Sequence, residues 1–339
     1  MEKPPEELSV SHLSHLMAEA ARAFADLKFT LDTQARYSRG CIPDDLHGPM
    51  PYGEYGPHSA TDFFSAIMPF LPRDLSSRKG KICKVPVANT LGCSWRWWPG
   101  SDMSAEEEER IRLYISSKHD INDTAYMWIP ELGICLPSEG KNRVNFCRYH
   151  RIETITACIY VNHYPQPDRI KIYDLKIAGG RETWAVLDEQ YVQKISHFVY
   201  ALPLLRAYGV KIESEWPVTS PPLYKVLKFA KDCSITSKFH REVIDLVAVR
   251  EKLNDAARKL AQGEEWVRGS ILDLPVYRKY VYFSALSVVL TVFSVFVIIF
   301  RQSNYSGVFV SIFMILFSVI MFFIVPIFKF RRKSLAGKS

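Results

Sequence analysis

The sequence lacks the features of small stapled, disordered or metal-binding proteins. Seven cysteines in 339 residues are too few for a disulfide-stapled scaffold, and no Cys-x-x-Cys pair is present. Low hydrophobicity combined with high net charge, which predicts disorder, is also absent, because 48% of the residues are hydrophobic. We therefore expect a folded protein with buried free thiols and no metal site.

Common catalytic motifs are missing as well. The chain has no G-x-S-x-G, H-E-x-x-H or Walker A sequence. The acidic run 106–109 follows Ser104 with capping-box spacing, so we expect it to be the solvated start of a helix. Catalytic residues remain unknown from the sequence, and whether the protein is an enzyme is left open.

Acidic residues are absent from residue 280 onward, which locates the excess positive charge. The formal net charge is +7, but six of the 43 Lys and Arg residues lie in this last part. The preceding residues then carry 37 bases against 36 acids and are almost neutral. This distribution does not favour DNA as a partner, because a DNA-binding domain needs a basic surface.

Two long uncharged runs occupy the C-terminal part. They are 281–300 and 306–328, each long enough for a helix that crosses a membrane. Basic residues flank the pair on its outer sides, so the positive-inside rule places both termini in the cytoplasm. The N-terminus lacks the apolar region of a signal peptide. The expectation is an integral membrane protein with two spans, in the plasma or inner membrane.

The expected fold class is an α+β cytosolic body followed by a C-terminal α-helical transmembrane hairpin. The predicted segments are an N-terminal amphipathic helix (1–40), a Pro/Gly-rich linker (41–81), an α+β domain (82–209), an irregular segment with a connecting helix (210–279), transmembrane helices (280–300 and 306–328) and a basic cytoplasmic tail (329–339). Within 210–279, the part 238–262 has apolar residues at alternating spacings of three and four. Packing against the body and a homo-oligomeric coiled coil are equally compatible with that pattern.

Finer patterns predict the elements of the body. Helices are expected over 6–38, 105–118, 144–150 and 188–208, and strands over 84–87, 127–129, 134–136 and 154–161. The segments 169–177 and 183–187 read as a hairpin, and 210–235 as irregular chain. The tryptophans at 95, 97 and 98 are compatible with core packing, a partner surface or stacking on a base.

The segment from Glu139 to Arg143 carries the most chemical information. A strand ends there, Gly140 permits close backbone approach, and a helix begins beside Lys141, Asn142 and Arg143. Free N–H groups, the helix dipole and a guanidinium together suit a phosphate. A turn with surface bases explains the same spacing, and the spacing alone favours that simpler interpretation.

The segment resembles the ParB/sulfiredoxin superfamily, over about residues 82–165 and extending toward 209. The family has a Gly-x-x-Arg turn after an acidic residue, matched here by Glu139 to Arg143, and then a strand matched by 154–159. The resemblance implies a ParB/sulfiredoxin-like mixed domain that binds a nucleoside triphosphate, ATP or CTP, with Mg²⁺. Gly140 would approach the phosphates, Arg143 would bind them, and Glu139 would hold Mg²⁺ or order the turn.

The sequence departs from both branches of this family. Lys141 and Asn142 replace the Glu-Arg pair of partition proteins, and no cysteine lies between Cys135 and Cys147, where sulfiredoxin has its catalytic thiol. The leading hypothesis is a membrane-anchored nucleotide-binding protein, with hydrolysis or phosphate transfer left open. The alternatives are a two-helix membrane-permeabilising effector controlled by a cytosolic sensor domain, and a noncatalytic membrane scaffold. Self-association is expected through 238–262 or through the hairpin.

Overall fold

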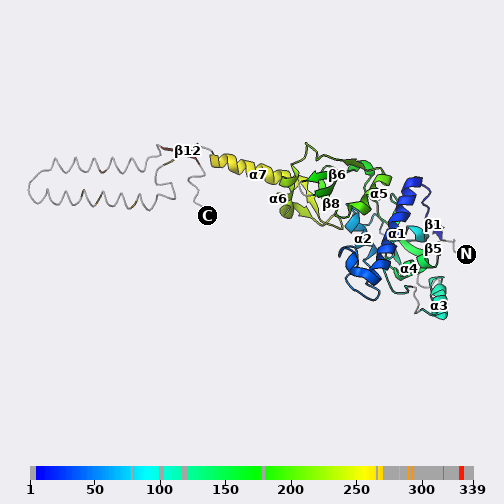
Figure 1. The fold of residues 1–339 in the computed structure, drawn as a ribbon. Helices are drawn as coiled ribbons and strands as arrows, with labels where there is room; N and C mark the ends of the chain where they lie inside the picture. Colours follow the sequence, from blue (N-terminus) through cyan, green and yellow to red (C-terminus); the bar gives the residue numbers. More distant parts are fainter. Residues whose placement is uncertain are drawn as a thin grey trace, which may run out of the picture. The chain divides into compact units, whose positions relative to one another are not determined.

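A computed structural model describes most of the body of the chain. It covers residues 5–77, 79–98, 103–116, 121, 123–177, 180–264, 266–269 and 328–331, with four isolated residues at 282, 289, 292 and 316. The chain divides into two compact units, Met1–Arg250 and Glu251–Ser339. The first unit is a mixed α/β body with two sheets (Figure 1).

Sheet 1 has five strands in the order β1-β2-β5-β3-β4. The strands are β1 (Glu6–Glu7), β2 (Lys81–Pro86), β5 (Thr154–Val161), β3 (Ala125–Ile129) and β4 (Ile134–Glu139). The pairs β1–β2 and β3–β5 are parallel, and the pairs β2–β5 and β3–β4 are antiparallel. The end of β4 therefore lies at an edge of the sheet.

Sheet 2 has six strands in the order β10-β11-β8-β7-β6-β9. The strands are β10 (Ser234–Ile235), β11 (Val243–Asp245), β8 (Tyr191–Lys194), β7 (Gly180–Leu187), β6 (Ile170–Ile177) and β9 (Lys211–Glu213). All neighbours pair antiparallel except β6 and β9. The predicted hairpin 169–177/183–187 is confirmed, because β6 and β7 pair in register along their full length.

The helices include three short 3₁₀ turns. They are α1 (His15–Ser38), α2 (Ala60–Ile67), α3 (Ala105–Ser116), α4 (Asn142–Tyr149), α5 (Phe198–Tyr208), α6 (Leu223–Cys233), α7 (Leu246–Glu264), η1 (Arg39–Cys41), η2 (Val87–Asn89) and η3 (Pro167–Arg169). Ser104 caps the start of α3, since its hydroxyl accepts a hydrogen bond from the backbone N–H of Glu107, which is one half of the predicted capping box.

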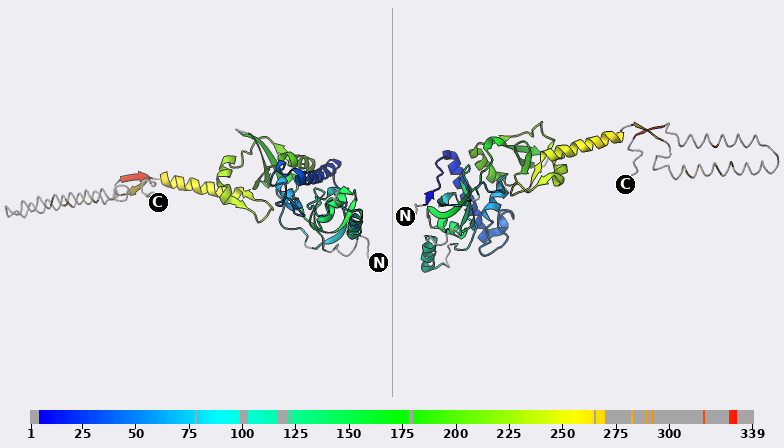
Figure 2. Two further views of the ribbon diagram at one scale, coloured as in Figure 1. Left: turned by 60° about the horizontal axis from the view of Figure 1, so that its bottom comes forward. Right: turned by 180° about the vertical axis from the view of Figure 1, so that it is seen from behind.

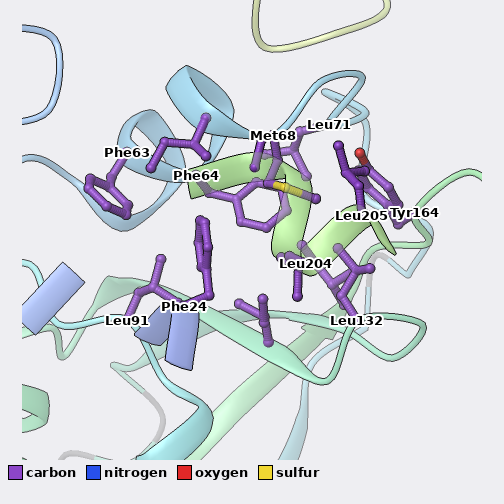
Figure 3. Close-up of a cluster of buried hydrophobic side chains, with 14 of the residues drawn as sticks. Phe24, Phe63, Phe64, Met68, Leu71, Leu91, Leu132, Tyr164, Leu204 and Leu205 are labelled. Atoms are coloured by element: carbon purple, nitrogen blue, oxygen red, sulfur yellow. The ribbon is translucent and has the colours of Figure 1, made fainter. Parts of the chain in front are cut away.

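Two apolar cores hold the body together. Figure 2 shows the ribbon of the chain from two further sides. The larger core joins α1, α2 and α5 to residues of both sheets, and Phe24 and Phe64 meet edge to face at its centre, 5.8 Å apart (Figure 3). The smaller core lies between sheet 1 and the helices α3 and α4, where Ile111 packs with Val144 and Phe146. Helix α4 is thus fixed against the sheet beside the end of β4.

Three stretches of the body differ from the sequence predictions. The helix expected over 6–38 begins only at His15, and Glu6–Glu7 forms the strand β1. The helix expected over 188–208 begins only at Phe198, because Asp188 and Glu189 take positive φ angles in a turn that leads into β8. Val192 and Ile195 are buried from an extended chain, although their spacing also suits a helix. The segment 210–235, expected to be irregular, contains α6, which begins directly after Pro222.

The predicted transmembrane hairpin requires correction. In the part of the chain that the structure describes, no helix is long and apolar enough to cross a membrane. An apolar run spans a bilayer only as one continuous helix of about 20 residues. The integral-membrane localisation, with two spans and both termini cytoplasmic, is therefore wrong by this finding. The segments 280–300 and 306–328 lie outside the described residues, apart from four isolated positions and Phe328.

The second unit contains a strand pair at the position where the second transmembrane helix was predicted to end. Phe328–Arg331 forms β13, which pairs antiparallel with β12 (Trp266–Gly269). The end of the second predicted span and the start of the basic tail are thus a strand. In α7, Leu246 and Val249 are buried, whereas Leu260 is 69% exposed. Self-association through 238–262 stays a prediction.

Candidate functional site

The turn between β4 and α4 requires a glycine. Gly140 has a φ of +75°, and a Cβ atom at this position would lie 2.7 Å from Cγ2 of Thr124. The hydroxyl of the buried Tyr126 donates a hydrogen bond of 3.0 Å to the carbonyl oxygen of Gly140. The Thr124 hydroxyl accepts one of 2.7 Å from the backbone N–H of Cys158. Strands β3 and β5 therefore hold the turn in place.

The five predicted site residues do not all face one place. Glu139 is exposed, and the ammonium group of Lys141 lies 4.8 Å from the centre of the Tyr55 ring. The Asn142 side chain accepts a hydrogen bond of 2.5 Å from the Ser94 hydroxyl. Arg143 points inward from the first turn of α4 and is only 3% exposed. The structure brings Gly140, Asn142 and Arg143 together and directs Lys141 elsewhere.

A small hollow of about 180 Å³ lies beside Arg143. Its lining residues come from four separate segments of the sequence: Trp97, Tyr114, Asp123, Thr124, Gly140, Asn142 and Arg143. The N-terminus of α4 adjoins this hollow, and the dipole of a helix favours an anion there. The N–H groups of Arg143 and Val144 themselves donate to the carbonyl oxygens of Gly140 and Lys141, at 3.3 Å each. The hollow thus combines a guanidinium with a helix N-terminus.

Arg143 lacks a polar partner among the described residues. Its Nη1 atom is buried without a hydrogen bond, and the structure describes no ion pair for this side chain. Its Cζ lies 5.5 Å from the centre of the Tyr114 ring. Because a buried cation without a counter-charge is strongly destabilising, an anion in the hollow would remove a real energetic penalty.

Arg148, on the same helix, shows the usual fate of a buried guanidinium. It donates to the carbonyl oxygens of Val87 at 2.9 Å and of Ala88 and Thr90 at 3.3 Å, and it pairs with Asp26. Burial lowers the pKa of Arg148, while Asp26 opposes this effect. Arg148 thus has several polar partners, whereas Arg143 has none among the described residues.

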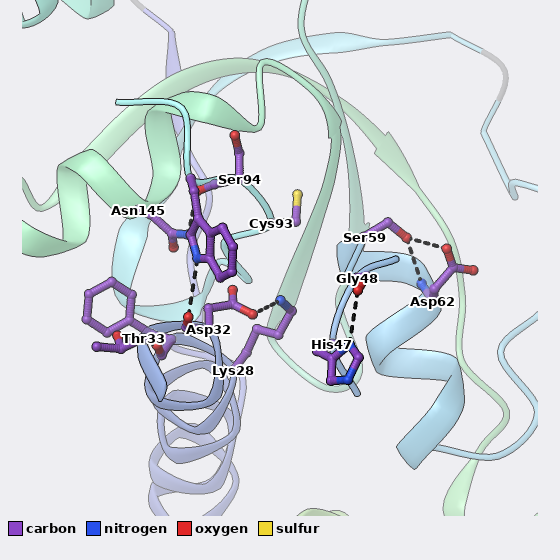
Figure 4. Close-up of polar contacts among 12 residues, drawn as sticks. Lys28, Asp32, Thr33, His47, Gly48, Ser59, Asp62, Cys93, Ser94 and Asn145 are labelled. Atoms are coloured by element: carbon purple, nitrogen blue, oxygen red, sulfur yellow. Dashed lines mark hydrogen bonds and ion pairs between the residues drawn. The ribbon is translucent and has the colours of Figure 1, made fainter. Parts of the chain in front are cut away.

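The sequence prediction missed a buried polar network that ties α4 to α1. The Asn145 amide donates 3.0 Å to the Ser94 carbonyl oxygen, and the Trp95 indole donates 3.2 Å to the Asp32 carbonyl oxygen. Lys28 and Asp32 form an ion pair inside this network (Figure 4). Burial raises the pKa of Asp32 to about 6, although Lys28 opposes the shift. Lys28 and Asp32 continue the apolar spacing of α1, and this conflict was the signal available in the sequence.

A larger hollow of about 620 Å³ lies on the other side of the turn, between the loop 44–59 and β4. Lys141, Cys93 and His58 line it. Burial raises the pKa of Cys93 to about 11, so its thiol is not a reactive nucleophile at neutral pH. All seven cysteines are free, as expected, and five are buried.

The described residues include no group of three or more His, Cys, Asp or Glu side chains that could hold a metal ion. Mg²⁺ needs less from the protein, because it takes one or two carboxylates and completes its shell with phosphates and water. Asp123 is the carboxylate on the lining of the small hollow, whereas Glu139 is not on that lining. Asp123 is therefore the residue suited to Mg²⁺ brought in with a phosphate ligand.

Comparisons with known proteins leave the family open. No family model matches the chain, and neither a curated protein nor a solved structure matches it. The resemblance to the ParB/sulfiredoxin superfamily stays a prediction that rests on the residues from Glu139 to Arg143 and on the strand after them.

Proposed function

We propose that this chain binds a nucleoside triphosphate, ATP or CTP, with a phosphate group in the hollow beside Arg143. One observation carries the proposal: Arg143 is buried, the Nη1 atom of its guanidinium has no hydrogen-bond partner among the described residues, and its side chain lines an open hollow. A phosphate oxygen bound there would supply both the missing hydrogen-bond acceptor and the missing negative charge.

The size of the hollow limits how much of the ligand it encloses. Pockets that enclose a drug-sized molecule usually measure about 300–1,000 Å³. The hollow beside Arg143 has only about 180 Å³. It therefore takes one phosphate group, and the remainder of the nucleotide lies at its mouth.

The proposal concerns binding and names no catalytic residue. Among the residues that the structure describes, the lining of the hollow includes one carboxylate, Asp123, and neither a thiol nor an imidazole. Asp123 would hold Mg²⁺ against the phosphates, which also reduces the repulsion between its carboxylate and the bound anion. Each lining residue named here thus has a part in binding.

Titration calorimetry of the full chain with ATP and with CTP, in the presence of Mg²⁺, tests the proposal. Charge-assisted hydrogen bonds contribute about 1.5–3 kcal/mol, so Arg143→Met should weaken binding roughly 10- to 100-fold. Arg143→Lys keeps the charge without the planar fork and should weaken it less. Arg110→Gln, which removes an exposed arginine on α3, is the matched control and should have no effect. Absence of binding by the wild-type chain, or equal affinity in Arg143→Met, contradicts the proposal.

A further inference from the structure

The mouth of the Arg143 hollow is aromatic. Trp97 and Tyr114 line it, with ring centres 5.4 Å apart and planes at 74°, an edge-to-face pair. Tyr114 is 42% exposed, an unusually open position for a large ring that already contacts Arg143. A ligand whose phosphate fills the hollow must place its next part against these rings, because the hollow holds little more than one phosphate.

Trp97 occupies a backbone conformation that disfavours its side chain. Its φ is +59°, in the left-handed region where a bulky residue is strained. The Ser94 hydroxyl accepts a hydrogen bond of 3.1 Å from the N–H of Arg96, and Trp98 N–H donates 3.0 Å to the Trp95 carbonyl oxygen. These bonds form a tight turn around Trp97, and a glycine at this position would adopt the same φ angle without strain.

Ser94 connects the turn at Trp97 to the turn between β4 and α4. Its hydroxyl accepts from Arg96 and donates to the Asn142 side chain, one residue before Arg143. The position of the Trp97 ring is thus tied to the start of α4. The hydrogen bonds of Ser94 therefore hold the Trp97 ring in a fixed position relative to the guanidinium of Arg143.

We infer that Trp97 and Tyr114 bind a planar ring of the ligand, so that the site selects phosphates attached to an aromatic ring system over inorganic polyphosphates and sugar phosphates. This inference rests on the proposed function and adds the residues that decide ligand specificity. Stacking on an aromatic side chain tolerates many ring types, since every such ring has a π face. The two rings therefore select for a ring without distinguishing adenine from cytosine.

The test compares two ligands that carry the same phosphates. ATP and inorganic tripolyphosphate are titrated, with Mg²⁺, into the full chain and into Trp97→Gly and Tyr114→Leu. Each variant should weaken ATP binding roughly 5- to 100-fold and leave tripolyphosphate binding unchanged, because only ATP has a ring to stack. Tyr114→Phe keeps the ring and should retain the affinity for ATP.

Two further measurements separate stacking from a structural effect. Tyr149→Leu removes an aromatic residue of α4 that is 57% exposed and lies off the lining of the hollow, so it should change neither affinity. The thermal midpoint of Trp97→Gly shows whether the variant is folded at the temperature of the titration, since relief of the strained φ opposes the loss of ring packing against the smaller core. Equal weakening of both ligands, or no weakening of ATP, overturns the inference.

The outcome also separates this inference from the proposed function. Arg143-dependent binding of tripolyphosphate, with no effect of Trp97→Gly or Tyr114→Leu on ATP, upholds the phosphate site and rejects the ring-binding residues. Failure of the wild-type chain to bind either ligand rejects both.

Discussion

The ammonium nitrogen of Lys28 lies 2.5 Å from Oδ1 of Asp32, one helical turn away on α1, and both side chains are buried from solvent. The second carboxylate oxygen, Oδ2, has no hydrogen-bond partner among the described residues. Such a pair loses its hydration on both sides, so it stabilises the fold only while both partners remain. The coupling energy between Lys28 and Asp32 is therefore larger than the net stability that the pair contributes to the fold.

Single substitutions in this pair should be far more damaging than the double substitution. Lys28→Met or Asp32→Leu alone leaves one charge buried without its partner and should lower the free energy of unfolding by roughly 3–5 kcal/mol. The double variant leaves no buried charge there and should lie near the wild type or above it. Urea denaturation of the four proteins gives the coupling energy, and additive effects would contradict the prediction.

The stability that Asp32 contributes should depend on pH. Its pKa in the folded protein is raised from 3.8 to about 6 by burial, so the folded state binds a proton more tightly than the unfolded state. This contribution is fully present below pH 3.8 and is lost as the pH rises through about 6, a change of about 3 kcal/mol. Unfolding free energies of the wild type and Asp32→Asn, measured from pH 4.5 to 7, should show the wild type losing stability relative to the variant. A constant difference would show that Asp32 does not titrate in this window.

Alanine substitutions at Gly140 and Gly53 distinguish the cost of backbone strain from the cost of steric crowding. Their φ angles are +75° and +76°, but a Cβ at Gly53 would meet nothing within 4 Å, whereas one at Gly140 would approach Thr124. Gly53→Ala should lower the free energy of unfolding by about 1 kcal/mol, and Gly140→Ala by about 2–4 kcal/mol. Chemical denaturation of both variants measures the two effects.

A second substitution at Thr124 checks the assigned cause. Thr124→Ser removes the crowding Cγ2 methyl group and keeps the hydroxyl that accepts from Cys158 N–H. The double variant Gly140→Ala/Thr124→Ser should lose only as much free energy of unfolding as Gly53→Ala, because the crowding is removed and the backbone strain remains. If it recovers nothing, the steric explanation is wrong.

The sequence predicts the secondary structure around the turn between β4 and α4 well. Strand β5 matches the expected range 154–161, and α4 begins within two residues of its predicted start. Local signals coincide there, since a short apolar strand leads into a glycine turn and a short helix, and the β-branched run 154–161 follows. At Val192 and Ile195 the signals conflict, because the same apolar spacing suits a helix and a bent strand. Tertiary pairing with β7 decides in favour of the strand.

The site was predictable only in part. Residue types and spacing point to Gly140 and Arg143, but the hollow beside Arg143 is also lined by Trp97 and Tyr114, which lie in segments distant in sequence. The separation of Lys141 from Arg143 depends on helix geometry, since neighbouring residues on a helix point in different directions. The apolar runs 281–300 and 306–328 show a second limit of the sequence predictions. The length of an apolar run alone does not establish a helix that spans a membrane.

The two buried arginines of α4 should respond to methionine in opposite ways. Arg143→Met removes an unpartnered buried donor and should raise the free energy of unfolding without ligand by about 1–3 kcal/mol. Arg148→Met leaves the carbonyl oxygens of Val87, Ala88 and Thr90 without this donor and should lower it by roughly 2–5 kcal/mol.

Denaturation with and without tripolyphosphate and Mg²⁺ measures both variants and connects stability to binding. A ligand that binds only the folded state raises stability with its concentration, so the wild type and Arg148→Met should gain stability on its addition. Arg143→Met should gain little, because it lacks the group that binds the phosphate. A loss of stability in Arg143→Met without ligand would show that this arginine stabilises the fold, and the Arg143 hollow would then lose its argument for an anion.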